Sequence, residues 1–309
     1  MLFPPRASPL TGYCLLFSGM ALVGVYTALS KPLSAAFPVF LLAWLRFAIS
    51  ALVMIPWLQR ADDEPLISSA TRRALFLQSL FGNFLFSILM LSGVAMTSAA
   101  AAGVVMAALP PLVAVFSWWF LRERAGTRVW IATVLAAAGI ALLSTGRGDP
   151  STPSSIAGNL LVLGAAACEA VYVILGKRLT ASLSPRRISA LINLIGLLLM
   201  TPLGLWQAAQ FDFSQISAPT WALLVFYSLS ASIFSTWLWL SGLKRVPAAH
   251  SGVFTVALPL AATAIAAIVL GETIGLSHLA ALGCALAGIA LIAWPGPKRI
   301  SVSLQEPRP

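Results

Sequence analysis

The sequence predicts an all-α integral membrane protein with ten transmembrane helices, arranged as two inverted five-helix repeats. Three observations lead to this fold class: the composition, the length of the apolar segments, and a long segment that the chain repeats. Hydrophobic residues make up 59% of the chain and charged residues only 9%, whereas a soluble domain carries roughly 25% charged residues. A soluble protein of this size could not cover its core with so few charges.

The net charge of +10 could suggest a nucleic-acid partner, but the basic residues form no stripe or aromatic-interleaved patch. They lie in short clusters between apolar segments, which is the pattern of bilayer proteins. The sequence therefore predicts no nucleic-acid binding. Cys14, Cys168 and Cys284 all lie within apolar segments at unrelated spacings, so we expect buried packing and neither a disulfide nor a metal site.

A transmembrane helix needs about 20 mostly apolar residues, and short segments rich in Pro or Gly join the apolar stretches of this chain. We expect the first stretch to be a retained helix and not a cleaved signal peptide, because it is about 20 residues long. The expected spans are 11–30, 35–58, 74–95, 97–121, 129–146, 156–177, 188–207, 221–242, 250–270 and 276–294. They give a first repeat over 11–146, a second over 156–294 and a cytoplasmic tail over 295–309.

Lys and Arg predict the orientation. With a cytoplasmic N-terminus, about 16 basic residues fall on the inner side, and only Lys31 and Arg147 fall outside. This bias is a strong positive-inside signal. We expect a multi-pass protein of the cell (inner) membrane with both termini in the cytoplasm.

One segment occurs twice. Shifting the chain by about 149 positions aligns 92–143 with 241–292 without a gap, with about 19 identities in about 52 pairs. Because each repeat has five helices, the second enters the membrane from the opposite side. Inverted repeats of this kind can exchange conformations around a site at the middle of the membrane, which is the architecture of transporters. A weaker match at an offset of about 146 pairs Tyr26 with Tyr172.

The repeated segment carries a proline, a glutamate and a glycine in one register. Each proline leaves a helix carbonyl without its N–H partner, and such a carbonyl should face protein or a wet cavity. We expect Pro110 and Pro259 to line or gate the cavity; a kink that only improves packing is the alternative. Structural or gating roles at helix ends are expected for Glu123, Gly126, Glu272 and Gly275.

These residues carry a family resemblance that extends over about 11–294. The segments LRFAISALVMIPWL, ALPP…LRERAG and ALPL…LGETIG, with the AAAGIALL and ALAGIALI endings, resemble the drug/metabolite transporter superfamily in its ten-helix EamA-domain branch. The resemblance implies a basket in which spans 1–4 and 6–9 surround a central cavity while spans 5 and 10 pack at its periphery. It also implies transport of small organic solutes, commonly export of amino acids or other metabolites. Glu169 stands where the family often has tryptophan.

Polar residues within the spans are candidates for the cavity, because a charge at mid-membrane costs several kcal/mol unless it is paired or hydrated. Arg46 and Glu169 are expected near the middle of their spans. They could form a structural ion pair, one or both could contact substrate, or they could lie at an interface. Tyr26 and Tyr172 are cavity candidates because they occupy matching repeat positions. Asn83, Asn193 and Gln78 could line the cavity or join helices by hydrogen bonds.

The function expected from these features is secondary transport of small organic metabolites by alternating access, with efflux of amino acids or related amphipathic solutes first. An importer or a channel-like facilitator of the same solutes is the alternative. The chain has no His-Glu-x-x-His, Gly-x-Ser-x-Gly or Walker motif, so we expect neither an enzyme nor direct use of ATP, and no cofactor. The expected partners are the small-molecule substrate, the lipid bilayer and a proton or counter-transported solute. The chain is expected to be a monomer or a homodimer.

Overall fold

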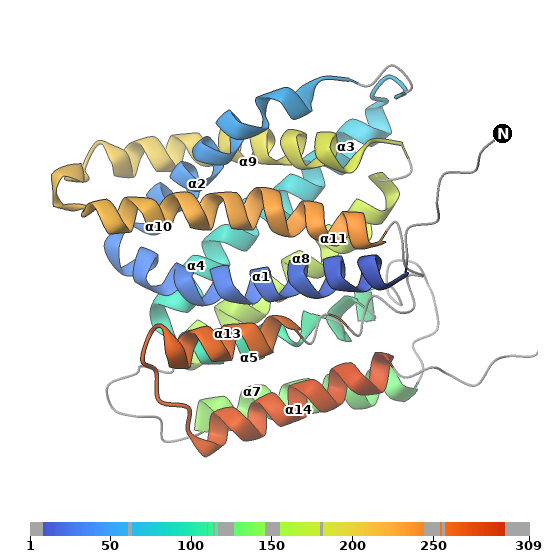
Figure 1. Cartoon of the computed structure of the whole chain (residues 1–309), viewed down its shortest axis with the longest axis vertical. Helices are drawn as coiled ribbons and strands as arrows, with labels where there is room; N and C mark the ends of the chain where they lie inside the picture. The colour runs from blue at the N-terminus through green and yellow to red at the C-terminus, as the bar shows by residue number, and fades with distance from the viewer. Residues whose placement is uncertain are drawn as a thin grey trace, which may run out of the picture.

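A computed structural model describes residues 9–60, 64–109, 111–113, 115–116, 127–145, 155–179, 182–243, 254 and 257–293. These residues are helical except for short joining segments, and they contain no β-strand. The helices run roughly parallel to one axis of a single bundle (Figure 1). The all-α class that the sequence predicts is therefore confirmed.

The helices of the described residues group into ten segments that follow the expected order of spans. Two of these segments, the third and the eighth, are interrupted by a π-helix. A short 3₁₀ helix, η3 (Phe213–Gln215), lies in the loop before the eighth. The ten segments are α1 (Pro9–Ala36); α2 with η1 (Val39–Met54, Ile55–Leu58); α3, η2 and α4 (Ser69–Ser79, Leu80–Leu85, Phe86–Met96); α5 (Ala99–Met106); α7 (Thr127–Thr145); α8 (Ile156–Leu179); α9 (Pro185–Ala208); α10, η4 and α11 (Ala218–Leu229, Ser230–Phe234, Ser235–Leu243); α13 (Ala257–Ile268); and α14 (Leu276–Ala293).

Six of the described helical segments are long and apolar enough to cross a membrane, and shorter apolar helices accompany them. The first is longer than the sequence suggested. It runs from Pro9 through Lys31 and Pro32 to Ala36, although we expected a span over 11–30 and a loop at Lys31. Pro32 removes a single N–H near the end of the helix, which is not enough to stop it.

Serine residues fix several helix starts. Ser68, Ser98 and Ser217 each adopt an extended backbone, and their side chains accept a hydrogen bond from an N–H three residues later. Such a cap satisfies one of the free N–H groups of a first turn. Three spans therefore start where a local polar signal interrupts the apolar sequence.

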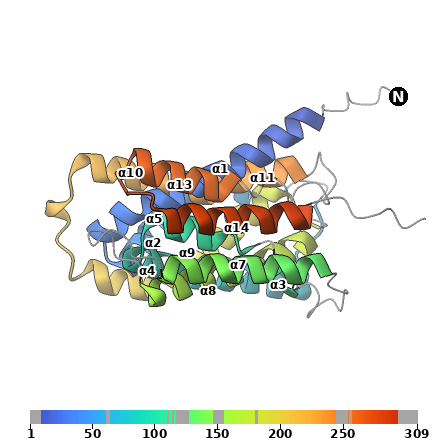
Figure 2. The same cartoon turned by 90° about the horizontal axis from the view of Figure 1, so that it is seen from below.

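The packing follows the inverted repeats. Helix α1, the first span of the first repeat, packs on α13 and α11 of the second repeat. Its counterpart α8, the first span of the second repeat, packs on α5 and α4 of the first repeat. Helices α7 and α14 pack against each other (Figures 1 and 2). They form the edge of the bundle, which is the peripheral place that the family resemblance implies for spans 5 and 10.

Two glycines show the symmetry at atomic detail. A Cβ on Gly93 would lie 2.7 Å from Val162 Cγ2 and 2.9 Å from the Gly158 carbonyl oxygen. A Cβ on Gly242 would lie 2.7 Å from Leu16 Cγ and 3.1 Å from the Gly12 carbonyl oxygen. The register that pairs Gly93 with Gly242 is the one found in the sequence. Each glycine therefore lets one helix approach another at the same place in its own repeat.

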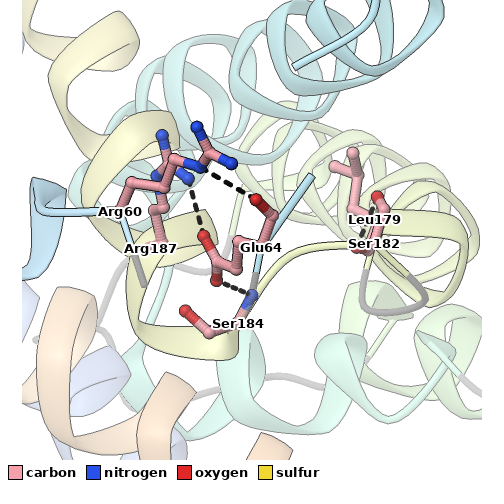
Figure 3. A network of polar contacts seen from close by, with 6 residues as sticks. All are labelled: Arg60, Glu64, Leu179, Ser182, Ser184 and Arg187. Atoms are coloured by element: carbon pink, nitrogen blue, oxygen red, sulfur yellow. Dashed lines mark hydrogen bonds and ion pairs between the residues drawn. The ribbon is translucent and has the colours of Figure 1, made fainter. Parts of the chain in front are cut away.

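Polar contacts join the two halves at both ends of the bundle. At the end where α2 leads into α3, Glu64 is bound by the first turn of α9 (Figure 3). Its carboxylate accepts hydrogen bonds from the Ser184 N–H at 2.7 Å and from Arg187 Nη1 at 2.6 Å. Its carbonyl accepts one from Arg60 Nε at 2.8 Å. At the opposite end, Glu272 binds the start of α5.

Candidate functional site

A small polar cavity lies between the two halves of the bundle. Its volume is about 30 Å³, room for only one or two water molecules. An organic solute therefore needs the surrounding helices to move apart before it can enter. Its walls come from α2, η2, α8, α9, η4 and α11, and the lining residues are Arg46, Asn83, Tyr172, Ser189, Ile192, Asn193, Ala231, Ser232 and Thr236.

Arg46 is the charged residue of this lining. It lies near the middle of the apolar span Val39–Leu58 and is only 4% exposed. Its Nη2 donates to Ser87 Oγ at 2.8 Å, and its guanidinium lies 4.3 Å from the centroid of the Phe47 ring. Its buried Nε–H has no hydrogen-bond partner among the residues that the structure describes. Because a desolvated guanidinium has five N–H donors, this side chain has unused capacity to bind an anion.

Two π-helical segments shape the cavity wall. The first, η2, places Asn83 in the wall, and the second, η4, places Ala231 and Ser232 there. Asn83 and Ser232 are related by the repeat register of about 149 residues. A π-segment widens the helix and leaves carbonyls out of the regular ladder, and such segments occur frequently at functional sites. Here the same irregularity occurs in both repeats, on the side that faces the cavity.

The two repeat-matched tyrosines, Tyr26 and Tyr172, lie in the same region as Arg46. Tyr172 packs on η2, where the absence of a side chain at Gly82 leaves room for the Tyr172 ring. Tyr26 is buried and meets Tyr227 edge to face, with ring centroids 5.9 Å apart. The charges of Arg46 and Glu169 are both close enough to act on Tyr26. Four of the residues singled out from the sequence, together with Asn83, therefore gather in one region.

Arg46 and Glu169 are near each other but do not form a direct ion pair. Among the described residues, the one ion pair with N···O within 4.0 Å joins Arg187 to Glu64. Arg46 and Glu169 interact electrostatically over a longer distance. Of the alternatives that the sequence left open, a bonded structural pair does not fit this geometry.

The repeated proline and glutamate lie elsewhere. Pro259 is buried in the first turn of α13, where a missing N–H costs no hydrogen bond of the helix. The carboxylate of Glu272 accepts hydrogen bonds from the Ala99 and Ala100 N–H groups at 2.9 and 3.1 Å. Gly275 precedes α14, and its carbonyl accepts a hydrogen bond from Leu279 N–H. Pro110, Glu123 and Gly126 lie outside the described residues.

The sequence did not single out the glycine whose backbone conformation is unusual. Gly271, after α13, has a φ of +66°, in the left-handed region that glycine tolerates best. Gly275 does not share this conformation. The turn that brings Glu272 toward α5 therefore depends on Gly271.

Several wall residues were also missed as a group. Ser189, Ser232 and Thr236 are small or neutral and lie in apolar segments, so composition does not distinguish them from packing residues. The repeat register could have found two of them. It relates Asn83 to Ser232 and Ser87 to Thr236, so polar residues recur at matched positions.

The chemistry of this site is that of binding. Within the described ranges, no group of His, Cys, Asp and Glu could hold a metal ion. The cavity offers one buried cation, aromatic faces, hydroxyls and amides. Such a set can hold a small solute with an anionic group and a hydrogen-bonding body.

The comparisons with known proteins agree with this geometry. A model of the EamA-like transporter family matches the chain twice, over residues 10–145 and 156–294. The uncharacterized transporter YetK of Bacillus subtilis is 32% identical over 280 residues, covering 90% of this chain and 85% of its own. The threonine/homoserine exporter RhtA of Escherichia coli is 32% identical over 182 residues, 58% of this chain and 57% of its own.

A solved crystal structure has the same fold. It covers 92% of this chain and 96% of its own, with a TM-score of 0.64. The sequence identity is 18%, so this match bears on the architecture alone.

Proposed function

The chain belongs to the EamA-like transporter family, and we propose that it is a secondary transporter that exports amino acids or related amphipathic solutes by alternating access. The route runs through the cavity at Arg46, between the repeats 11–146 and 156–294. Each repeat contributes one π-segment to the cavity wall. Movement of one repeat against the other would open the cavity to either side in turn.

The observation that carries this proposal is the burial of the Arg46 charge without a directly bonded carboxylate. A cation at mid-membrane is costly and needs an anion or a polar cavity. Arg46 is only 4% exposed and donates a hydrogen bond to Ser87, and no carboxylate of the described residues lies within 4.0 Å of its nitrogens. A solute carboxylate would supply a directly bonded anion through a charge-assisted hydrogen bond, which the more distant Glu169 does not.

The solute class and the direction follow from a relative and from the charge of the cavity wall. The relative RhtA is a threonine/homoserine exporter by name, and an arginine in an otherwise neutral wall suits a solute with a single carboxylate. The many basic residues of the expected inner loops support an inner-membrane location with both termini in the cytoplasm. We propose a monomer or homodimer, driven by a proton or solute gradient.

Reconstitution tests the proposal. Purified protein in proteoliposomes loaded with a radiolabelled L-amino acid should release it faster than empty liposomes, with saturation and with stimulation by unlabelled amino acid on the other side. Arg46→Gln should lower this flux by about tenfold or more, because a charge-assisted contact is lost. Arg72→Gln, at an exposed position in α3, is the matched control and should keep the flux.

The alternatives give different results. Flux without saturation or counterflow would indicate a channel-like facilitator. Accumulation driven into the side that corresponds to the cytoplasm would indicate an importer. Full flux in Arg46→Gln would remove Arg46 from the transport route.

A further inference from the structure

We propose that the cavity recognises the two charged ends of an α-amino acid separately, the carboxylate through Arg46 Nε and the ammonium through the side-chain oxygen of Asn193. This inference rests on the proposed function and deepens it. It assigns a specificity role to Asn193, which is buried in α9 at 2% exposure. It also predicts that solutes with only one of the two charges bind poorly.

Arg46 provides a free hydrogen-bond donor. Arg46 uses Nη2 to bind Ser87, while its Nε–H is buried and has no partner. A buried donor without a partner costs free energy. An incoming carboxylate relieves that cost and neutralises the cation in one contact.

Asn193 provides a free hydrogen-bond acceptor. Asn193 Nδ2 donates to the Phe47 carbonyl oxygen at 3.0 Å. This bond fixes the orientation of the amide, because the opposite orientation would place two oxygens against each other. Asn193 Oδ1 is then directed elsewhere, and it is buried without a partner. A carbonyl oxygen is the natural acceptor for an ammonium group.

These two atoms are singled out by comparison with the rest of the structure. Of the six buried polar side-chain atoms without a partner in the described residues, two belong to cavity-lining residues, and they are these two. The Asn83 amide, by contrast, already donates to the Ile192 carbonyl oxygen at 2.8 Å. The unused capacity of the wall is therefore one cationic donor and one neutral acceptor, which complements a zwitterion.

Water is the competing occupant. A cavity of about 30 Å³ can hold a water molecule, and a water could bridge the same two atoms. In that case the two residues would stabilise the closed protein without selecting a solute. The experiment must therefore separate recognition of each charge from general stability.

The test measures ligand-induced thermal stabilisation of the purified full-length protein, which does not depend on the direction of transport. Each of the twenty standard L-amino acids is tried first. The most stabilising one is then compared with its carboxamide, which lacks the carboxylate, and with the corresponding acid that lacks the α-amino group. The variants are Arg46→Gln, Asn193→Leu and Asn193→Asp. The matched controls are Arg72→Gln and Gln210→Glu, both at exposed positions.

A crossed pattern is expected. The unmodified protein should prefer the amino acid to either derivative by about tenfold or more. Arg46→Gln should lose the preference over the carboxamide and keep the preference over the acid. Asn193→Leu should do the reverse. Asn193→Asp is isosteric, and a protonated carboxyl at this buried position would donate its O–H to the Phe47 carbonyl oxygen and keep its other oxygen as the acceptor. This variant should therefore keep the preference over the acid even if Asn193→Leu does not fold.

Three outcomes overturn the inference. If amino acids bind but Arg46→Gln and Asn193→Leu reduce both preferences equally or neither, two-point recognition is wrong while the proposed transport of amino acids stands. If Asn193→Asp loses the preference over the acid, Asn193 is not the ammonium site. If none of the twenty amino acids stabilises the protein, both this inference and the amino-acid substrate of the proposed function fail.

Discussion

Glu64 and Arg187 form a buried ion pair that joins the segment before α3 to the first turn of α9. Their charged atoms are 2.6 Å apart, and the two side chains are 8% and 12% exposed. The other carboxylate oxygen of Glu64 accepts the Ser184 N–H at the start of α9, so the pair also acts as a helix cap (Figure 3). This contact joins the first repeat to the second through both a charge pair and a backbone hydrogen bond.

Removing either partner should destabilise the protein. Glu64→Gln and Arg187→Gln each leave a largely buried charge without its partner, and we expect a loss of about 1–3 kcal/mol. The double variant should recover part of that loss, because no charge then remains unpaired. Thermal unfolding of the purified variants measures this. Arg73→Gln, exposed in α3, is the matched control, and equal melting temperatures for all variants would contradict the prediction.

The same pair predicts a dependence on pH. Burial by itself would raise the pKa of Glu64, but the hydrogen bonds from Arg187 and Ser184 outweigh burial and hold the pKa below its usual value of 4.5. A lowered folded-state pKa contributes stability that is complete above the unfolded value and is lost as the pH falls through the folded one. The melting-temperature difference between wild type and Glu64→Gln should therefore be constant near neutral pH. It should shrink as the pH falls below about 4.5; a constant difference would show that the carboxylate charge contributes nothing.

Glu272 should stabilise the opposite end of the bundle. Its two oxygens bind the first two N–H groups of α5, Ala99 and Ala100, where a negative charge also interacts favourably with the helix dipole. Glu272→Gln keeps one acceptor oxygen and should cost about 0.5–1 kcal/mol, and Glu272→Ala should cost about 1–2 kcal/mol. The order wild type, Gln, Ala in thermal stability checks this, and a reversed order would show that the carboxylate is not a cap.

Much of the fold could be predicted from the sequence because membrane spans and repeats leave strong signals. A segment that spans the lipid must be a long apolar helix, so the apolar composition alone predicted the ten segments. The positions of the helix ends were predicted less well. Helix α1 continues through Pro32, beyond the expected end at residue 30, because one missing N–H does not end a helix. The π-segments η2 and η4 were not foreseen, since no residue type specifies them.

The candidate site could be predicted only in part. Charged Arg46 and repeat-matched Tyr172 stood out against apolar neighbours, and both line the cavity. The sequence left Asn193 as a residue that lines the cavity or joins helices, because only the direction of one amide oxygen separates these roles. Pro259 stood out strongly but lies in the first turn of α13, away from the cavity lining. Sequence reveals which residues are unusual, whereas hydrogen-bond partners decide which of them are free to bind.

The last prediction uses the repeat symmetry of Gly93 and Gly242. A methyl group at either position would meet both a side chain and a backbone oxygen of the neighbouring helix, at 2.7–2.9 Å for Gly93 and 2.7–3.1 Å for Gly242. Backbone cannot yield as a flexible side chain can, so we expect Gly93→Ala and Gly242→Ala each to cost about 1–3 kcal/mol. Because the two sites are related by the repeat, their costs should be similar.

Gly283→Ala is a control for which we expect the opposite change in stability. It lies in α14, and a Cβ there would meet no atom within 4 Å. Without a clash, the better helix propensity of alanine should dominate, so Gly283→Ala should stabilise the protein by about 0.5–1 kcal/mol. Thermal unfolding of the three single variants measures both effects in one series. Equal changes at all three glycines would mean that helix propensity alone acts, and that α4 and α11 do not depend on close approach to α8 and α1.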